Sequence, residues 1–165
     1  MDTVQTLIHD LSGLPAVVRQ VEYRTKGFHL ELELALPELV ACTELLRTRD
    51  FYLVFISAVH LDPVITVIYQ FASFQYPCRI MVRLPVDAEC SVPSIAPIFD
   101  GANWHERETR DMFGVLFRGH PYLEPLLLAE EDAELKPLLK RGGALKTAEN
   151  IGWAAASDQQ RDVEP

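Results

Sequence analysis

The chain has 165 residues, of which 48% are apolar, and a formal net charge of −9 at pH 7. This length and composition favour one domain with a hydrophobic core and at most an appended tail. The negative charge argues against a nucleic-acid-binding protein, whose phosphate ligand requires a basic face, and against electrostatic docking on an anionic lipid surface.

The sequence predicts no membrane anchor and no secretion signal. Its uninterrupted apolar runs are short, such as residues 51–56, whereas a membrane-spanning helix needs about 20 apolar residues. The first residues, MDTVQTLIHDL, lack the basic start and apolar run of a signal peptide. We therefore expect a soluble, cytoplasmic protein that reaches a membrane only through a partner.

Three scattered cysteines, Cys42, Cys78 and Cys90, form no CxxC motif. They offer no framework for an iron–sulfur cluster, a zinc ribbon or a disulfide scaffold. We expect three free thiols in a reducing compartment.

The first elements in chain order are a helix and a strand pair. Residues 3–11 predict an amphipathic helix, because apolar residues recur there at helical spacing (Val4, Leu7, Ile8, Leu11). Residues 16–23 and 28–34 predict two strands of a hairpin that turns at Lys26-Gly27. The second strand alternates strictly and is typical of a half-buried strand, with Phe28, Leu30, Leu32 and Leu34 on one face and His29, Glu31 and Glu33 on the other.

A second helix and three more strands follow. Pro37 is suited to the first turn of a helix that runs to about Arg47, with Leu39, Cys42, Leu45 and Leu46 inward. Residues 51–58 are apolar on both faces, which predicts a central strand covered on both sides. With turns at Asp62-Pro63 and Tyr76-Pro77, this run and the strands predicted at 64–74 and 79–84 form an antiparallel meander.

After a proline-rich connection over 85–97, the stretch 102–121 reads ANWHERETRDMFGVLFRGHP. It predicts a helix that starts near Asp100-Gly101 and ends at Gly114, followed by an extended arm. Glu106 with Arg110, and Arg107 with Asp111, have the i,i+4 spacing of ion pairs on one helix face.

This helix has two interpretations. A run of charges is usually a solvated, ion-paired face. However, its apolar stripe is thin (Ala102, Trp104, Met112, Phe113), and the arm has no hairpin partner within reach. Because interface cores favour Trp, Phe, Met and Arg, we interpret the segment as a surface that a second protein covers.

Together these elements predict an α+β fold: a mainly antiparallel sheet with helices packed on it, followed by a motif helix and an extended C-terminal arm. We divide the chain into a core domain (1–100), the signature helix and arm (101–128) and a C-terminal tail (129–165). The tail contains an acidic cluster and Gly142-Gly143, and we expect its last residues to be disordered.

Catalytic and metal-binding motifs are not apparent. His105-Glu106 begins like a zincin motif, but position 109 is Thr where a second His is needed. His60 and Asp62 have no assignable third ligand, and the sequence has no GxSxG, GxGxxG or P-loop. A stand-alone enzyme is therefore the weaker hypothesis.

The signature stretch resembles a known family. The residues that carry the resemblance are Ala102-Asn103-Trp104, Glu106-Arg107-Glu108, Asp111-Met112-Phe113-Gly114-Val115, Phe117 and Gly119-His120-Pro121. They are similar to the signature of the C subunit of bacterial respiratory NADH:quinone oxidoreductase, whose mitochondrial counterpart is the thirty-kilodalton subunit of complex I. The order of the preceding elements extends the resemblance over residues 3 to about 128.

The resemblance implies a subunit without cofactors in the peripheral arm of the complex, on the cytoplasmic face of the membrane. It would pack on the large subunit that helps form the quinone site, near a smaller cluster-bearing subunit, with no catalytic or metal residues of its own. The expected partner-contacting residues are Trp104, Glu106, Arg107, Glu108, Asp111, Phe113, Gly114, Phe117, Gly119, His120 and Pro121.

Two alternatives stay open. The same domain resembles a subunit of membrane-bound [NiFe]-hydrogenase and formate hydrogenlyase-type complexes. In a different class, a free-standing hydrolase would use His105, Glu106 and His120.

Overall fold

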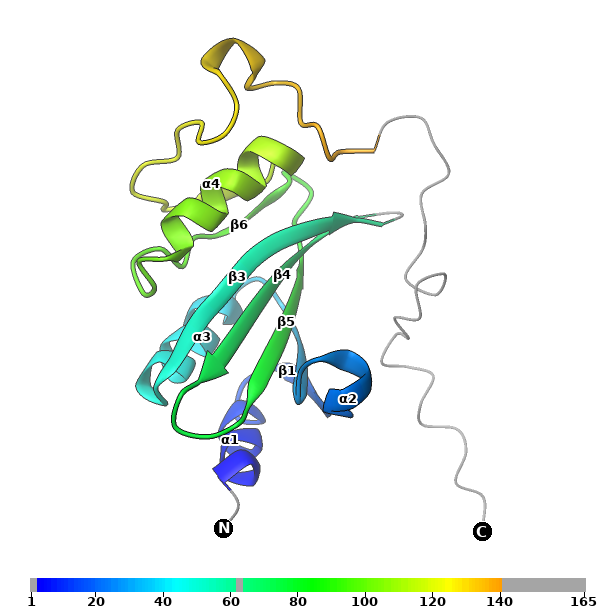
Figure 1. Cartoon of the computed structure of the whole chain (residues 1–165), viewed down its shortest axis with the longest axis vertical. Helices are drawn as coiled ribbons and strands as arrows, with labels where there is room; N and C mark the ends of the chain where they lie inside the picture. Colours follow the sequence, from blue (N-terminus) through cyan, green and yellow to red (C-terminus); the bar gives the residue numbers. More distant parts are fainter. Residues whose placement is uncertain (1–2, 62–63, 141–165) are drawn as a thin grey trace.

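The fold is built on a five-stranded sheet in the order β1-β2-β5-β4-β3, with a separate two-stranded ribbon of β6 and β7 (Figure 1). This computed structural model describes residues 3–61 and 64–140. The predicted turn at Asp62-Pro63 and the tail from residue 141 onward, with Gly142-Gly143, lie outside the described residues. The elements are α1 (Thr3–Leu11), β1 (Ala16–Gln20), α2 (Tyr23–Lys26), β2 (Leu30–Leu34), α3 (Glu38–Thr48), β3 (Phe51–His60), β4 (Ile65–Ser73), β5 (Arg79–Pro85), β6 (Ser91–Pro93), α4 (Ala102–Phe113), β7 (Leu116–Arg118) and the 3-10 helix η1 (Glu130–Asp132).

The predicted hairpin of β1 and β2 is confirmed, because the two strands pair antiparallel. The first strand is shorter than predicted and ends at Gln20, where the sequence suggested Tyr23. The side chain of Glu22 accepts a hydrogen bond from the backbone N–H of Arg24 at 3.2 Å and so caps the short helix α2. Gly27, at φ 78°, then ends α2 in the left-handed conformation.

The meander of β3, β4 and β5 is also confirmed, but β3 is not the central strand that its apolar sequence suggested. It pairs only with β4 and forms one edge of the sheet. The central position is taken by β5, which pairs antiparallel with β4 and parallel with β2. The second apolar face of β3 is therefore not covered by a layer of helices, and Val54 remains 37% exposed.

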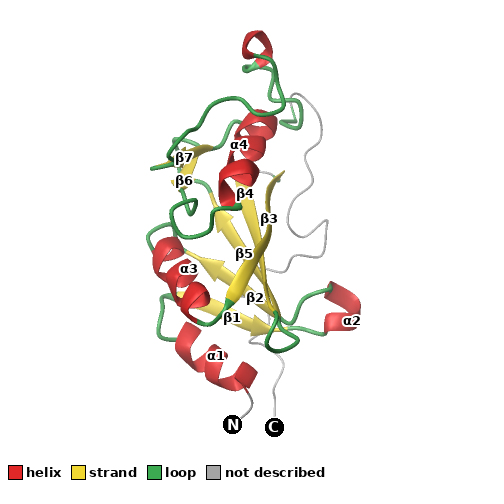
Figure 2. Cartoon of the chain, turned by 60° about the vertical axis from the view of Figure 1, so that its left-hand side comes forward, coloured by secondary structure: helices red, strands yellow, loops and turns green. Residues whose placement is uncertain are grey.

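The hydrophobic core lies on the face of the sheet that α1 and α3 cover, and Figure 2 shows these helices on one side with α2 on the other. Alternate residues of the strands point into this core, as the alternation predicts. They meet the apolar stripes of the two helices, and the fully buried members include Leu30, Leu32, Leu39, Cys42, Leu46, Ile80, Val82 and Leu84. Among the described residues, no helix is both long and apolar enough to cross a bilayer.

The arm after Gly114 has a partner within the chain, contrary to the sequence-based expectation. Residues 116–118 form β7, which pairs in parallel with β6 at residues 91–93. The prediction failed because this partner lies in the proline-rich connection, outside any hairpin. The core cluster continues from the sheet through Phe99, Ala102 and Phe117, so it is continuous across the predicted division at residue 100.

Val67, in the centre of β4, offers a test of the strand assignment, because its side chain is fully buried. We expect Val67→Asp to unfold the chain, since an unpaired buried carboxylate costs several kcal/mol, about as much as the whole stability of a typical domain. Circular dichroism and thermal unfolding measure the effect. Val54→Asp on the edge strand is the matched control and should remain folded; if both variants fold equally well, the assignment of Val67 to the core is wrong.

Candidate functional site

Helix α4 starts and ends where the sequence predicts. Gly101 precedes its first residue, and Gly114, at φ 79°, ends it by donating its N–H to the carbonyl of Arg110 at 2.8 Å. Ala102 and Phe113 are buried in the core cluster, so this chain holds the helix through its thin apolar stripe. The site is built by the polar side chains of α4 that point to the same side.

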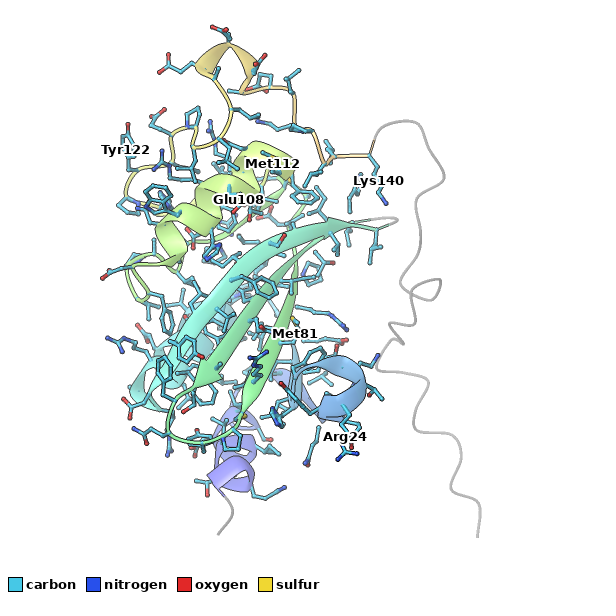
Figure 3. All side chains as sticks on the ribbon, viewed as in Figure 1. Arg24, Met81, Glu108, Met112, Tyr122 and Lys140 are labelled. Atoms are coloured by element: carbon cyan, nitrogen blue, oxygen red, sulfur yellow. The ribbon has the colours of Figure 1, made fainter. Side chains whose placement is uncertain are left out.

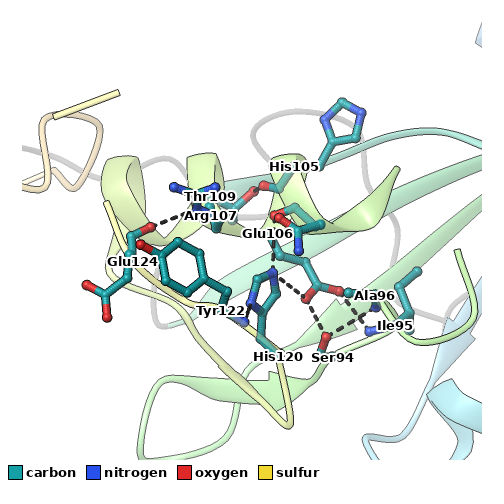
Figure 4. A network of polar contacts seen from close by, with 11 residues as sticks. Ser94, Ile95, Ala96, His105, Glu106, Arg107, Thr109, His120, Tyr122 and Glu124 are labelled. Atoms are coloured by element: carbon teal, nitrogen blue, oxygen red, sulfur yellow. Dashed lines mark hydrogen bonds and ion pairs between the residues drawn. The ribbon is translucent and has the colours of Figure 1, made fainter. Parts of the chain in front are cut away.

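Glu106 is fully buried in the middle of α4 and does not pair with Arg110 (Figure 4). Its Oε2 accepts a hydrogen bond from the Ser94 hydroxyl at 2.6 Å, and its Oε1 accepts one from the Ile95 N–H at 2.7 Å. Burial raises the pKa of Glu106 to about 7, although these donors act in the opposite direction. The predicted surface ion pair is therefore wrong: this carboxyl group fastens α4 to the segment before it.

His120 lies beside this buried carboxyl group, with its Nε2 3.9 Å from Oε2 of Glu106. The Tyr122 N–H donates to its Nδ1 at 3.0 Å, so the proton lies on Nε2, which is 3.2 Å from the Asn103 carbonyl oxygen. Burial lowers the pKa of His120, and the nearby charge of Arg107 lowers it further against the hydrogen bond to Asn103. The geometry therefore favours a neutral imidazole that joins the arm to the start of α4.

Arg107 binds the next part of the arm. Its Nε donates to the carbonyl oxygen of Glu124 at 2.9 Å and its Nη2 to that of Pro125 at 2.8 Å. Its guanidinium also lies over the ring of Tyr122, 5.2 Å from the centroid. Arg107 therefore positions residues 122–125 and does not form the predicted pair with Asp111.

Asp111 binds the part of the arm that follows. Its Oδ2 accepts hydrogen bonds from three consecutive backbone N–H groups, those of Leu126 at 2.8 Å, Leu127 at 2.8 Å and Leu128 at 3.2 Å. Burial opposes ionisation, but these donors and the charge of Arg110 outweigh it and lower the pKa of Asp111. An ionised carboxylate therefore holds this turn of the arm.

We call these residues the helix clamp: Asn103, Glu106, Arg107 and Asp111 on α4, together with His120 on the arm. Their contacts advance along the helix and along the arm in the same direction, from His120 to Leu128. What the arrangement accomplishes is the fixing of an otherwise irregular segment against a helix.

The structure does not assemble the hydrolase site that the sequence left open. Figure 4 shows His105 pointing away from the Glu106–His120 pair. Within residues 3–61 and 64–140, no group of three His, Cys, Asp or Glu side chains could hold a metal ion.

The predicted partner-contacting residues divide into two sets. Four of them are buried within this chain: Glu106, Asp111, Phe113 and Phe117. A side chain enclosed by its own chain offers nothing to a partner, so these four support the surface from below. The residues left at or near the surface are Trp104, Arg107, Glu108, Gly114, Gly119, His120 and Pro121, with the His120 ring itself turned inward.

Sequence reasoning missed several residues that build or border this surface. Ser94 and Asn103 complete the clamp, and neither belongs to a recognisable motif. Tyr122 is 60% exposed, and the large apolar side chains of Leu116, Leu127, Leu135 and Leu138 are also exposed. Figure 3 shows Tyr122 and Met112 beside α4. The apolar run at 126–128 was the available signal.

The family model described as "Respiratory-chain NADH dehydrogenase, 30 Kd subunit" matches residues 32–146 of this chain. A similar curated protein is the C subunit of the NADH-quinone oxidoreductase of Roseiflexus sp. (strain RS-1), which is 48% identical over 80 residues. This match covers 48% of the present chain and 45% of that protein. The chain thus spans less than half the length of the curated relatives it matches.

Two solved structures share the α+β fold, which confirms the predicted fold class. A trypsin-resistant fragment (1-134) of Nqo5 gives a TM-score of 0.61 at 22% identity and covers 73% of this chain and 98% of that chain. A chain from the membrane-bound sulfane sulfur reductase, an archaeal respiratory membrane complex, gives a TM-score of 0.71 at 21% identity, covering 83% of each chain.

The buried carboxyl group of Glu106 predicts a pH dependence of stability. Its pKa is about 7 in the fold against 4.5 for the unperturbed group. A raised folded-state pKa gives stability that is fully present below pH 4.5 and lost as the pH rises through 7. In Glu106→Gln this loss disappears, so the free energy of unfolding of the wild type should fall relative to the variant by up to about 3 kcal/mol between pH 4.5 and 8.

Chemical unfolding of both proteins across this pH range measures the difference. His120, with its lowered pKa, contributes stability that is lost as the pH falls below 6.5, the opposite sign. That contribution is present in both proteins and largely cancels in the comparison. Parallel pH profiles would show that Glu106 is not the titrating group.

The three N–H donors to Asp111 predict a local effect on the arm. In Asp111→Ala, we expect amide hydrogen exchange at Leu126, Leu127 and Leu128 to become at least about tenfold faster, since hydrogen bonds to a charged acceptor contribute about 1.5–3 kcal/mol. Exchange followed by NMR resolves these amides individually. Glu108→Ala, which removes an exposed carboxylate of the same helix, is the control and should leave them unchanged; equal exchange in the two variants would contradict the clamp.

Proposed function

The chain belongs to the family of the respiratory-chain NADH dehydrogenase 30 Kd subunit, and from that premise we propose that it is a structural subunit in the peripheral arm of an NADH:quinone oxidoreductase. The observation that carries the proposal is the helix clamp, in which the signature charges of α4 hold the chain's own arm. Residues used in this way shape a surface and perform no chemistry. The role is to complete and brace a complex whose electron transfer runs through other subunits.

The surface fixed by the clamp has the composition of an interface. Trp104 is 66% exposed and Tyr122 is 60% exposed, and Leu127 on the same arm is also exposed. Tyr, Trp and Arg dominate the energetic centres of protein interfaces. Because the clamp fixes the arm before any partner arrives, a partner would not have to supply the cost of ordering it.

The family resemblance supports specific partners. We propose that this surface docks on the large quinone-site subunit of the complex, close to its cluster-bearing neighbour. In this arrangement the chain binds no cofactor and contacts the membrane only through its partners, on the cytoplasmic side. The four enclosed signature residues, Glu106, Asp111, Phe113 and Phe117, then set the shape of the contact without touching it.

A second candidate has one observation in its favour. The structural likeness to a chain of the sulfane sulfur reductase, at a TM-score of 0.71, shows that this fold occurs in another respiratory membrane complex. The domain would then serve a hydrogenase-type complex of the [NiFe]-hydrogenase or formate hydrogenlyase kind. The subunits purified with the tagged chain from native membranes separate the two: NADH-oxidising subunits support the first and a hydrogenase large subunit supports the second.

Arg107→Ala tests the docking role. Loss of the hydrogen bonds to Glu124 and Pro125 should loosen the arm locally by about 1–3 kcal/mol but leave the core intact. We expect the isolated variant to fold and the amount of assembled complex to fall. Circular dichroism measures the first outcome; native gel electrophoresis and NADH:quinone activity of membranes measure the second.

Two further variants make the test specific. Trp104→Ala removes a side chain that is mostly exposed, so it should alter the stability of the isolated chain by less than about 0.5 kcal/mol while still reducing assembly. Arg47→Ala, an exposed position on α3, should assemble normally. Wild-type levels of active complex in both Arg107→Ala and Trp104→Ala would contradict the proposed docking surface.

A further inference from the structure

The main sheet has a second face, here called the outer face, that α1 and α3 do not cover. Among the described residues, no helix lies across β3, β4 and β5 on this side, as Figures 1 and 2 show. Figure 3 shows Met81 of β5 on the face turned toward the viewer. An apolar surface of this kind marks a contact site when its composition identifies what could cover it.

Strand register places a row of residues across one end of the outer face. Tyr52 of β3 pairs with Ala72 of β4, and Ala72 pairs with Arg79 of β5. The Arg79 N–H donates to Nδ1 of His29 at 3.0 Å, which brings the start of β2 alongside. Neighbouring strands lie about 4.8 Å apart, so these four residues form a continuous row.

Aromatic rings extend this row at both ends. Phe74 stacks on Tyr52, with ring centroids 4.2 Å apart and planes at 19°. Tyr23, the first residue of α2, stacks on His29 at 4.5 Å. Phe74 is 85% exposed, although large aromatic side chains are normally buried for most of their area. The chain therefore presents this ring to the outside.

The same row carries positive charge. Arg79 lies within it, and Arg24 and Lys26 follow Tyr23 on α2; all three side chains are exposed, and Figure 3 shows Arg24 projecting from α2. No carboxylate of the described residues lies within ion-pair distance of these three cations. They stand out in a chain of net charge −9.

Given the proposed function as a subunit of a complex, we propose that this aromatic–basic row (Tyr52, Phe74, Arg79, Tyr23, Arg24 and Lys26) is a second docking surface, for a protein segment with apolar side chains next to Asp or Glu. The stacked pair Tyr52–Phe74 provides apolar contact area, and the three cations complement carboxylates. Figure 1 places α4 at the other end of the sheet from the β4–β5 turn that carries Phe74. The row is therefore separate from the surface of the helix clamp.

The charge of the whole chain favours a protein segment over a lipid surface. Three local cations can pair with a few carboxylates at short range. An anionic bilayer would also meet the excess of acidic residues that makes the net charge −9. A short acidic and apolar segment matches both parts of the row without that repulsion.

Photo-crosslinking in the assembled complex tests the proposal. The probe is p-benzoylphenylalanine placed at position 74 of the full chain, with the complex purified from native membranes and the crosslinked peptides identified by mass spectrometry. We expect a peptide of another subunit that carries an Asp or Glu within a few residues of the crosslinked site. A crosslink to a segment without carboxylates, to lipid or to a second copy of this chain would overturn the proposal, as would the absence of any crosslink.

A charge reversal adds a quantitative readout. Arg79→Glu should lower the crosslink yield at position 74 at least about fivefold at low salt, whereas the matched reversal Arg47→Glu on α3 should not change it. Equal yields would contradict the role of the cations. Flotation with phosphatidylglycerol vesicles should show no binding of the full chain, and binding that Arg79→Glu abolishes would assign the row to lipid and overturn the proposal.

The two proposals fail in different ways. A chain that enters no respiratory complex contradicts the proposed function. A chain that enters the complex through the helix-clamp surface, while the probe at position 74 reaches no subunit, contradicts only the second docking surface.

Discussion

The enclosed carboxyl group of Glu106 is the constraint on which the signature region depends. A carboxyl group without solvent must find hydrogen-bond donors in the protein, and here they come from Ser94 and Ile95 in the connection that precedes the helix. This requirement fixes where the connection lies against α4. With the connection in place, β6 is positioned to receive β7, and the chain after Gly114 takes a defined path.

The remaining clamp contacts continue that logic along the helix. Arg107 binds two carbonyl oxygens and Asp111 binds three N–H groups, so donors and acceptors of an irregular segment are satisfied by side chains in place of a strand partner. The result is an ordered arm that leaves Trp104 and Tyr122 at its surface. A family of subunits that must fit a larger assembly gains a preformed contact surface from such an arrangement.

Periodicity alone predicted the elements whose environment is local. The helices α1 and α3 and the strands β4 and β5 have one apolar face each, and that face is buried as expected. The parallel pairing of β2 with β5 and the edge position of β3 were not predictable in this way, because alternation shows that a strand is buried without showing what lies beside it. The family resemblance pointed to the right segment for the site but not to its contacts. The i,i+4 spacing of Glu106 and Arg110 suits a surface ion pair equally well, and only distant residues such as Ser94 decide that the carboxyl group turns inward.

The parallel contact between β2 and β5 also governs the order in which the fold can form. Leu30 lies opposite Ile80, so the N-terminal hairpin cannot join the rest of the sheet until β3, β4 and β5 have been synthesised. During translation the hairpin and α3 must therefore remain accessible, held only by their own short-range contacts, while the meander emerges from the ribosome. Contacts between residues so distant in sequence slow folding, because the intervening loop must close before any pairing energy is gained. Nascent chains of this protein thus pass through a period in which the edge of β2 is open to chaperones or to premature pairing with other chains.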